Sequence, residues 1–295
     1  MPGAPQDRTI QIGEIKTRYW AGGSQGSPVV LIHGLGCHVE DWQANFDALA
    51  ALHRVWALDL PGHGRTDKPA DAPYGVPYLA TFVQDFMAAL QISRAHVVGH
   101  SMGGAVATRL AFTHPELVDR LVLVASAGLG RQVHLGLRLA SVPRLGERLM
   151  RPSRAGAATF ARMTIYDPAV ITEEKIDCDY ALAAQPGALE ALLRTARTGL
   201  NLFGQKRSLW GLHVSRLPSI TAPVLVVWGR QDPTIPVAHA EVAAKGLPNV
   251  RVQIFDKCGH VPMLEKADAF NALLLEFLGD PVGGEVRQQE DRSYA

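Results

Sequence analysis

The segment A-H-V-V-G-H-S-M-G-G-A-V-A-T-R-L-A (95–111) joins a short apolar run to a stretch with helical character. At the junction lies G-H-S-M-G (99–103), which matches the pattern G-x-S-x-G. A sharp turn from a strand into a helix strains its central residue, and small neighbours let the chain pack that tightly. This placement predicts that Ser101 is a nucleophile at the carboxyl end of a strand, where a helix N-terminus favours developing negative charge.

The pattern alone is a weak signal, because about one chain in ten of this length contains it by chance. The competing interpretation is a plain glycine-rich turn in which Ser101 only caps the following helix. A nucleophilic serine needs a base and an acid elsewhere in the chain, so the presence of these partners distinguishes the two interpretations.

Short apolar runs rich in β-branched residues recur along the chain, and segments of helical length such as Leu79–Leu90 and Met102–Phe112 lie between them. This alternation predicts an α/β fold with a mostly parallel central sheet and helices on both faces. We expect two further short strands at 9–13 and 16–21, after a mobile lead-in over the first ten residues. The apolar runs are 28–34, 54–60, 95–100, 120–126, 222–229 and 250–256.

The alternation stops between 128 and 217, where the sequence is rich in Arg, Ala and Leu and contains no convincing strand. Its clearest helix is 188–198, and strand signals resume after it. We therefore predict a core in two halves, 1–127 and 218–280, separated by a helical cap insertion at 128–217. The last residues, 281–295, are expected to form a disordered tail.

A serine hydroxyl is a poor nucleophile at neutral pH and needs a base that a third group orients. Asp232 follows the apolar run 222–229, and His260 follows the run 250–256, just before a helix predicted at Glu265–Leu278. Both side chains would reach the sheet edge that carries Ser101. We expect His260 to accept the proton of Ser101 and Asp232 to fix its tautomer.

Other residues compete for these roles. Asp256 is the main rival acid, but it lies too near His260 along the chain to support it comfortably. Asp59 precedes the serine, and we expect it to order its own loop. Of the histidines, only His260 comes after the acid and at a strand end; the others weighed are His33, His63 and His114.

The transition state also needs hydrogen-bond donors for the oxyanion. We predict the backbone N–H of Met102, which follows the nucleophile, and the N–H of Leu35 in the loop H-G-L-G (33–36). Losing one such donor typically costs about 3 kcal/mol of barrier lowering. The second assignment could shift by one residue along this loop.

Composition limits the remaining possibilities. The 29 Lys and Arg against 28 Asp and Glu leave a net charge of +1. A nucleic-acid or anionic-membrane partner would favour a clustered basic excess, so we expect neither a nucleic acid nor a membrane as partner. The three cysteines, Cys37, Cys178 and Cys258, are odd in number and far apart, so we expect free thiols and a cytoplasmic protein.

No N-terminal signal and no run of ~20 apolar residues is evident, although an exported form would need only a signal that has been removed. The glycine clusters form neither a dinucleotide fingerprint nor a phosphate loop, and no metal-ligand cluster stands out, so we expect no cofactor. The expected partner is a small-molecule substrate. None of these sequence patterns predicts an oligomeric state.

Together these residues resemble the α/β-hydrolase superfamily, in its branch of capped esterases, lactonases and carbon–carbon hydrolases. The motifs that carry the resemblance are L-I-H-G-L-G, D-L-P-G-H-G-R-T-D-K-P, V-V-G-H-S-M-G-G, V-V-W-G-R-Q-D-P and C-G-H-V-P-M-L-E. They cover the core and do not extend into the insertion. The resemblance implies a Ser-Asp-His triad and a helical cap that shapes the pocket and gates access to it.

The resemblance also ranks the possible reactions. Dehalogenases and epoxide hydrolases of this superfamily carry an aspartate where this chain has Ser101. Meta-cleavage-product hydrolases share the triad and S-A-G-L-G (126–130), but they usually have Asn and Trp where this chain has His100 and Val261.

The leading prediction is therefore hydrolysis of a carboxylic ester or lactone through an acyl-enzyme. The first alternative is carbon–carbon cleavage of a diketo acid, for which a cap arginine would pair with the substrate carboxylate. The second is a ligand-sensing protein with slow turnover. The cap arginines are expected mainly on solvated helix faces; they are Arg131, Arg138, Arg144, Arg151, Arg154, Arg194 and Arg197.

Overall fold

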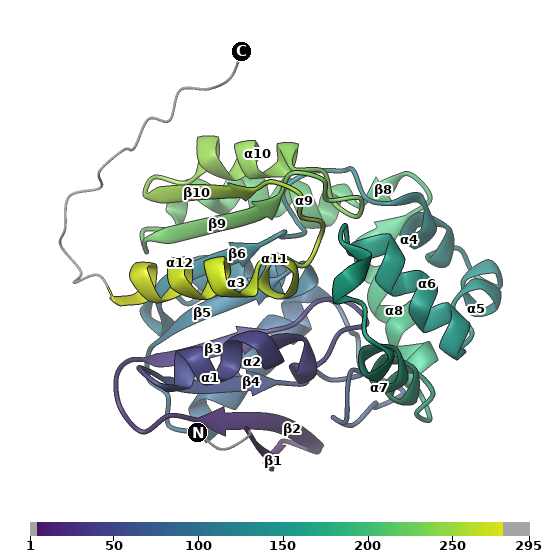
Figure 1. Cartoon of the computed structure of the whole chain (residues 1–295), viewed down its shortest axis with the longest axis horizontal. Helices are drawn as coiled ribbons and strands as arrows, with labels where there is room; N and C mark the ends of the chain where they lie inside the picture. Colours follow the sequence, from purple (N-terminus) through teal and green to yellow (C-terminus); the bar gives the residue numbers. More distant parts are fainter. Residues whose placement is uncertain (1–4, 280–295) are drawn as a thin grey trace.

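The computed structural model describes residues 5–279 and is built on one eight-stranded sheet (Figure 1). The strand order is β1-β2-β4-β3-β5-β6-β9-β10. From β4 to β10 all neighbours are parallel, while β1, β2 and β4 pair antiparallel at one edge. The strands are β1 (Gln6–Ile12), β2 (Ile15–Gly22), β3 (Pro28–Ile32), β4 (Arg54–Leu58), β5 (Ala95–His100), β6 (Val118–Val124), β9 (Val224–Gly229) and β10 (Val250–Phe255).

Helices cover both faces of the sheet, which confirms the predicted α/β-hydrolase fold. Successive side chains of a strand point to opposite faces, so each central strand contributes to two cores. In β3, Val30 and Ile32 belong to the core that α2 (Val76–Ala89), α3 (Met102–Thr113) and α10 (Ala238–Gly246) cover. Val29 and Leu31 pack with α1 (Gln43–Ala50) and α12 (Ala267–Gly279).

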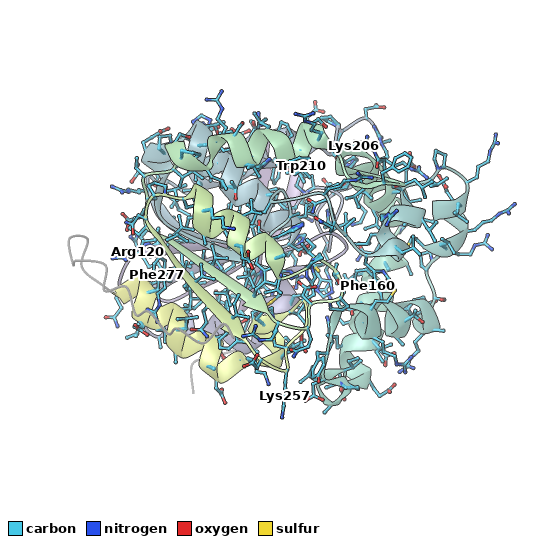
Figure 2. All side chains as sticks on the ribbon, turned by 90° about the horizontal axis from the view of Figure 1, so that it is seen from above. Arg120, Phe160, Lys206, Trp210, Lys257 and Phe277 are labelled. Atoms are coloured by element: carbon cyan, nitrogen blue, oxygen red, sulfur yellow. The ribbon has the colours of Figure 1, made fainter. Side chains whose placement is uncertain are left out.

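The second face also carries a cation–π contact. Arg120 of β6 lies over the ring of Phe277 on α12, with 5.4 Å between the guanidinium carbon and the ring centroid (Figure 2). This contact lets a buried arginine join the apolar layer beneath α12.

Helices α4 to α9 follow β6 and precede β9, within the span predicted for the insertion, and we call residues 128–217 the insert. In Figure 1, α4 to α8 lie beyond one end of the sheet, with α5 at the outermost edge, while α9 lies beside α10. The helices are α4 (Leu135–Ala140), α5 (Leu145–Leu149), α6 (Arg154–Thr164), α7 (Glu173–Ala183), α8 (Ala188–Gly199) and α9 (Arg207–Arg216).

Three features differ from the sequence prediction. The first strand begins at Gln6, so the lead-in predicted as mobile is paired from there with β2. The insert contains a small hairpin of two-residue strands, β7 (Leu200–Asn201) and β8 (Gly204–Gln205), which are too short to give a periodic signal. A short helix, α11 (Pro262–Glu265), precedes α12. The tail predicted to be disordered, 281–295, lies outside the described residues.

Within residues 5–279, every helix falls short of the length and apolar character that a bilayer crossing requires.

The turn between β5 and α3 is so tight that two glycines have no space for a side chain. A Cβ on Gly99 would lie 2.3 Å from the carbonyl oxygen of Gly103, and a Cβ on Gly103 would lie 2.3 Å from that of Ile32. In both cases the obstacle is backbone, which cannot rotate away. The glycines flanking Ser101 are thus required by packing.

We predict that Gly99→Ala lowers the free energy of unfolding by more than the ~1–3 kcal/mol typical of overpacked cores, because strand and helix must separate. Urea unfolding followed by circular dichroism measures this change. The control is Gly279→Ala, at a position where a Cβ meets no atom within 4 Å. Equal stability of the two variants would contradict the packing argument.

Candidate active site

Ser101 occupies the strained backbone conformation expected of the turn. Its φ is 52° and its ψ is −116°, in a region that residues with a side chain rarely adopt. Hydrogen bonds hold it there: its N–H donates to the carbonyl of Val124, and its carbonyl accepts from Ala127, both at 2.9 Å. The hydroxyl-bearing carbon therefore stands at the carboxyl end of β5, at the first turn of α3.

Asp232 and His260 are brought together, as predicted. The Nδ1 of His260 lies 2.8 Å from Oδ2 of Asp232, and the carboxylate is fully buried. Its other oxygen accepts N–H donors from Thr234 at 2.7 Å and Ile235 at 2.9 Å. These three hydrogen bonds satisfy a buried carboxylate and fix its orientation, so Nδ1 is the protonated ring nitrogen and Nε2 is left as an acceptor.

The loop that carries His260 is anchored beside the serine. The Nε2 of His100, the residue before Ser101, lies 2.9 Å from the carbonyl oxygen of His260, and the two rings are 4.9 Å apart. Burial, then the neighbouring imidazole, lowers the pKa of His100 to about 3. His100 is therefore neutral at physiological pH and donates to that carbonyl, which ties the two loops together.

Glu265 holds the other side of this loop, a role that the sequence analysis missed. One of its carboxylate oxygens accepts the N–H of Gly259 at 2.9 Å, and the other accepts that of Tyr166 in the insert at 2.7 Å. The N–H of His260 itself donates to the carbonyl of Thr164, at the end of α6, at 2.7 Å. The insert thus helps to position the candidate base.

Ser101 opens onto a narrow apolar cavity of about 60 Å³ between the core and the insert. Leu35 and Met102, the residues predicted as oxyanion donors, line this cavity beside the serine. Thr234 and Ile235, which hold the Asp232 carboxylate, also line it. Among the described residues, no hydrogen bond joins the Ser101 hydroxyl to His260. Such bonds are often long in an unliganded site and shorten when substrate binds.

The rival residues have other partners. Asp256 forms an exposed ion pair with Arg230. Asp59 is fully buried and accepts the N–H of Val39 and of Arg65 at 2.8 Å each, so it orders its own loop, as expected.

The rival histidines are engaged elsewhere as well. The Nε2 of His33 accepts the N–H of Leu60 at 3.0 Å, and the Nδ1 of His63 lies 3.1 Å from the carbonyl of Pro61. His114 pairs with Glu116.

A buried charge network joins the insert to the loop that follows β3. His38 lies between two carboxylates, with Nδ1 2.8 Å from Glu40 and Nε2 3.0 Å from Asp179 on α7. Lys175 of α7 reaches Asp41 at 2.8 Å and Asp179 at 3.2 Å. Burial by itself lowers the pKa of the imidazole, but the carboxylates of Asp41, Asp179 and Glu40 raise it well above its ordinary value. An imidazolium therefore holds α7 to the core.

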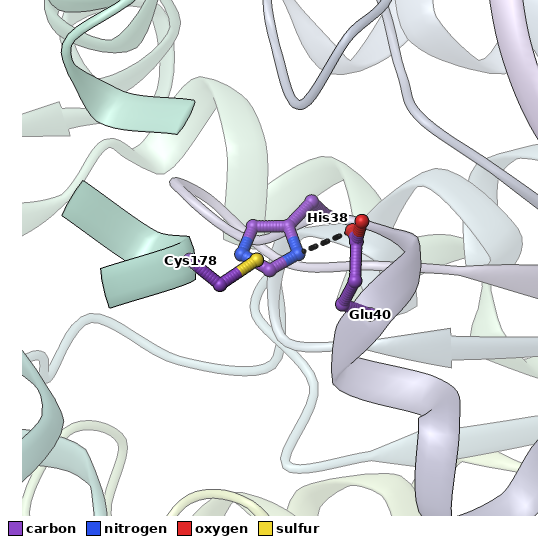
Figure 3. A group of neighbouring side chains, drawn as sticks. All are labelled: His38, Glu40 and Cys178. Atoms are coloured by element: carbon purple, nitrogen blue, oxygen red, sulfur yellow. Dashed lines mark ion pairs between the residues drawn. The ribbon is translucent and has the colours of Figure 1, made fainter. Parts of the chain in front are cut away.

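Among the described residues, two groups of three side chains could hold a metal ion, and both lie in this network. His38, Glu40 and Cys178 place ligand atoms within 4.8 Å of one another (Figure 3), and His38, Asp41 and Asp179 do so as well. Each nitrogen of the imidazole already contacts a carboxylate oxygen, and Lys175 forms ion pairs with two of the carboxylates. The imidazole and the carboxylates of these groups are thus already engaged in ion pairs with one another and with Lys175. Cys37, Cys178 and Cys258 are all free thiols.

The chain belongs to the alpha/beta hydrolase fold family, whose sequence model matches residues 27–267. One similar protein is the dihydrolipoyllysine-residue acetyltransferase component of the acetoin cleaving system from Cupriavidus necator. It is 37% identical over 265 residues, which cover 90% of this chain and 67% of that protein. Another is the 2-hydroxy-6-oxononadienedioate/2-hydroxy-6-oxononatrienedioate hydrolase of Cupriavidus pinatubonensis, 29% identical over 92% of this chain and 94% of the relative.

Solved structures support the same assignment. The meta-cleavage product hydrolase from Pseudomonas fluorescens IP01 superposes with a TM-score of 0.80 at 27% identity, covering 92% of this chain and 97% of the other. The hydrolase of 2-hydroxy-6-oxo-6-phenylhexa-2,4-dienoate from Rhodococcus gives a TM-score of 0.80 at 25% identity, covering 94% of this chain and 99% of that one. The chain is thus a hydrolase with this fold.

We predict that His38→Gln lowers the free energy of unfolding by about 3 kcal/mol, because it leaves buried carboxylates without their cation. A raised folded-state pKa gives stabilisation that is complete below the unfolded pKa of about 6.5 and is lost as pH rises through the folded value. The difference between wild type and variant should therefore shrink between about pH 6 and about pH 10. Urea unfolding at both pH values measures it.

The matched control is His114→Gln, which removes a partly exposed imidazole that pairs with Glu116. It should change stability little at either pH. A His38→Gln penalty that is constant across this pH range would show that the imidazole is neutral in the folded protein.

Proposed function

We propose that this protein hydrolyses an uncharged carboxylic ester or lactone through a Ser101 acyl-enzyme, with Asp232 and His260 completing the triad. The observation that carries the proposal is the His260 ring. Asp232 holds its Nδ1, and the hydrogen bond from His100 anchors its loop next to the nucleophile. Such an arrangement lets Nε2 accept the serine proton.

The proposed reaction has two halves. Nε2 of His260 accepts the hydroxyl proton as Oγ of Ser101 attacks the ester carbonyl, and the imidazolium then protonates the leaving alcohol. A water molecule, deprotonated by the same nitrogen, attacks the acyl-enzyme and releases the acid. The buried Asp232 carboxylate stabilises the imidazolium in both halves.

The oxyanion donors are proposed to be the N–H groups of Met102 and Leu35. Support for Leu35 comes from the preceding carbonyl, that of Gly34, which accepts hydrogen bonds from Nδ1 of His33 at 2.7 Å and from the N–H of Cys37 at 3.3 Å. In a trans peptide the N–H points opposite to the C=O. Holding the Gly34 carbonyl in place therefore makes the Leu35 N–H point in the opposite direction within the same peptide plane.

The cavity favours an uncharged substrate. None of the described residues that line it is Asp, Glu, Lys, Arg or His, and its polar side chains are the hydroxyls of Ser, Thr and Tyr and one glutamine. That glutamine, Gln205, already accepts the N–H of Gly128 at 2.7 Å and donates to the carbonyl of Gln132 at 3.3 Å. A carboxylate buried there would have no cationic partner, which costs several kcal/mol.

The insert is proposed to act as a cap over this cavity, since α4 and α8 supply lining residues such as Leu137 and Thr195. A free volume of about 60 Å³ admits only a few heavy atoms. A larger substrate would have to displace part of the cap, which would then gate access.

A second candidate is carbon–carbon hydrolysis of a diketo acid, which is favoured by the names of the similar hydrolases. The uncharged cavity lining weighs against it, because such substrates carry carboxylates. The name of the Cupriavidus necator relative suggests a third outcome for the same acyl-enzyme, namely transfer of the acyl group to an acceptor other than water.

We predict that Ser101→Ala abolishes turnover of a short-chain p-nitrophenyl ester and that Asp232→Asn lowers kcat by about 10⁴-fold. The reason for the second effect is loss of the correct imidazole tautomer. Release of p-nitrophenolate measures both. The matched control is Asp256→Asn, which removes the rival acid and should leave kcat unchanged. Activity that survives Ser101→Ala, or an equal loss in Asp256→Asn, would refute the triad.

We predict that kcat/KM for a p-nitrophenyl butyrate exceeds that for the p-nitrophenyl ester of succinic acid, which carries a free carboxylate, by at least about 100-fold. The same comparison should include a meta-ring-fission diketo acid, cleaved more slowly than the neutral ester. Faster cleavage of the diketo acid would identify the carbon–carbon reaction as the function. Binding of ligands without any turnover would instead favour a sensing role.

A further inference from the structure

Basic charge is concentrated in one part of the insert. Residues 131–162 contain seven arginines and a single acidic residue, Glu147. The whole chain has a net charge of only +1, so the remainder of the chain is net negative. The proposed reaction uses none of these arginines, and the cavity lining excludes them.

Exposed apolar side chains lie among these arginines. On α5, Leu145 and Leu149 are both exposed, the latter at 53%, and Arg148 lies between them on the same helical face. On α4, Leu135 is 53% exposed. Exposed apolar side chains that gather on one surface and are rimmed by polar residues are typical of protein or membrane interaction sites.

The turn of the β7–β8 hairpin continues this surface. Phe203 at the turn is 66% exposed, and the guanidinium of Arg131 lies 5.9 Å from its ring centroid. Arg138 of α4 donates to the carbonyl of Leu202 at 2.7 Å, which fixes the turn against α4. We call the surface formed by α4, α5 and this turn the α4–α5 edge; α5 is its outermost element in Figure 1.

Three arginines in and beside α5 are available to an outside partner. Arg144, Arg148 and Arg151 are exposed, and none of them forms an ion pair with any described residue. The neighbouring acid, Glu147, is already paired with Arg197 at 2.8 Å. In the view from above, long side chains with nitrogen at their tips extend outward from this end of the molecule (Figure 2).

We propose that the α4–α5 edge docks onto a membrane surface whose lipids carry negative charge. Arginines would meet the phosphate groups while the leucines and Phe203 enter the boundary between headgroups and acyl chains. The positive charge of the arginines favours an anionic surface. The exposed aliphatic and aromatic side chains favour a lipid surface over a purely acidic polypeptide, which has no apolar layer for them to enter.

The α4–α5 edge shares two of its elements with the cavity beside Ser101. Leu137 of α4 and Leu200 of β7 line the cavity beside Ser101, while Leu135 of α4 and Leu202 in the turn after β7 are exposed. Docking through this edge would bring the walls of the cavity to the membrane surface, where apolar esters accumulate. The docking does not depend on the proposed reaction.

The test measures binding of the full chain to sedimenting vesicles of phosphatidylglycerol and phosphatidylcholine, and to vesicles of phosphatidylcholine alone. We expect binding to the first only, weakening as salt is raised. Replacing Arg144, Arg148 and Arg151 together by Glu should weaken binding by about 100-fold or more. Replacing Leu149 and Phe203 together by Ser should weaken it by at least about 10-fold.

The control carries the same change of charge elsewhere: Arg8→Glu, Arg216→Glu and Lys257→Glu, at exposed positions outside the edge. It should bind anionic vesicles like the wild type. All variants should keep the kcat/KM of the wild type on a soluble neutral ester, which separates docking from catalysis and shows that they fold. Absence of vesicle binding, equal loss in the control, or binding to polyglutamate without binding to vesicles would overturn the proposal.

Discussion

The site depends on a serine backbone that is held at positive φ. Ser101 keeps a φ of 52° because β5 and α3 approach so closely that Gly99 and Gly103 have no room for Cβ. A conformation of this kind costs on the order of 1–3 kcal/mol and persists only where the surrounding packing over-determines it. Here every residue of β5 is buried in the middle of the sheet, which supplies that rigidity.

The loop after β9 carries Asp232 and the loop after β10 carries His260, both at the edge of the sheet where Ser101 lies. Their supports come from distant parts of the chain: Glu265 holds the loop of His260 to Tyr166, and the carbonyl of Thr164 accepts the N–H of His260. The insert therefore positions the loop of the candidate base and also supplies part of the cavity lining. The ion pairs of His38 and Lys175 with Asp179 fasten α7 to the core, so the insert is held at more than one point.

The sequence predicted the parts of this structure that depend on local pattern. Strands buried on both faces appear as continuous apolar runs, and the glycine spacing around Ser101 reflects a steric requirement that only small residues meet. Asp232 and His260 were predicted as partners of Ser101 because each follows such a run. Their hydrogen bond was predicted from chain order and is present at 2.8 Å.

Features that rest on long-range partners could not be read in the same way. His38 and Asp179 are 141 residues apart, and no local pattern connects them. Glu265 looks like an ordinary helical residue until its two oxygens are seen to hold separate loops. The arginine cluster of the insert was visible in the sequence, but the net charge of the whole chain, +1, conceals it because acidic residues elsewhere cancel it.

The most direct test of the triad is covalent labelling with a fluorophosphonate, followed by mass spectrometry of the intact protein and of its peptides. The account predicts one adduct per chain, on Ser101, formed rapidly in the wild type and at least about 10³-fold more slowly in His260→Gln, because the imidazole must accept the serine proton. An adduct on another residue, or labelling of Ser101 at the same rate without His260, would contradict it.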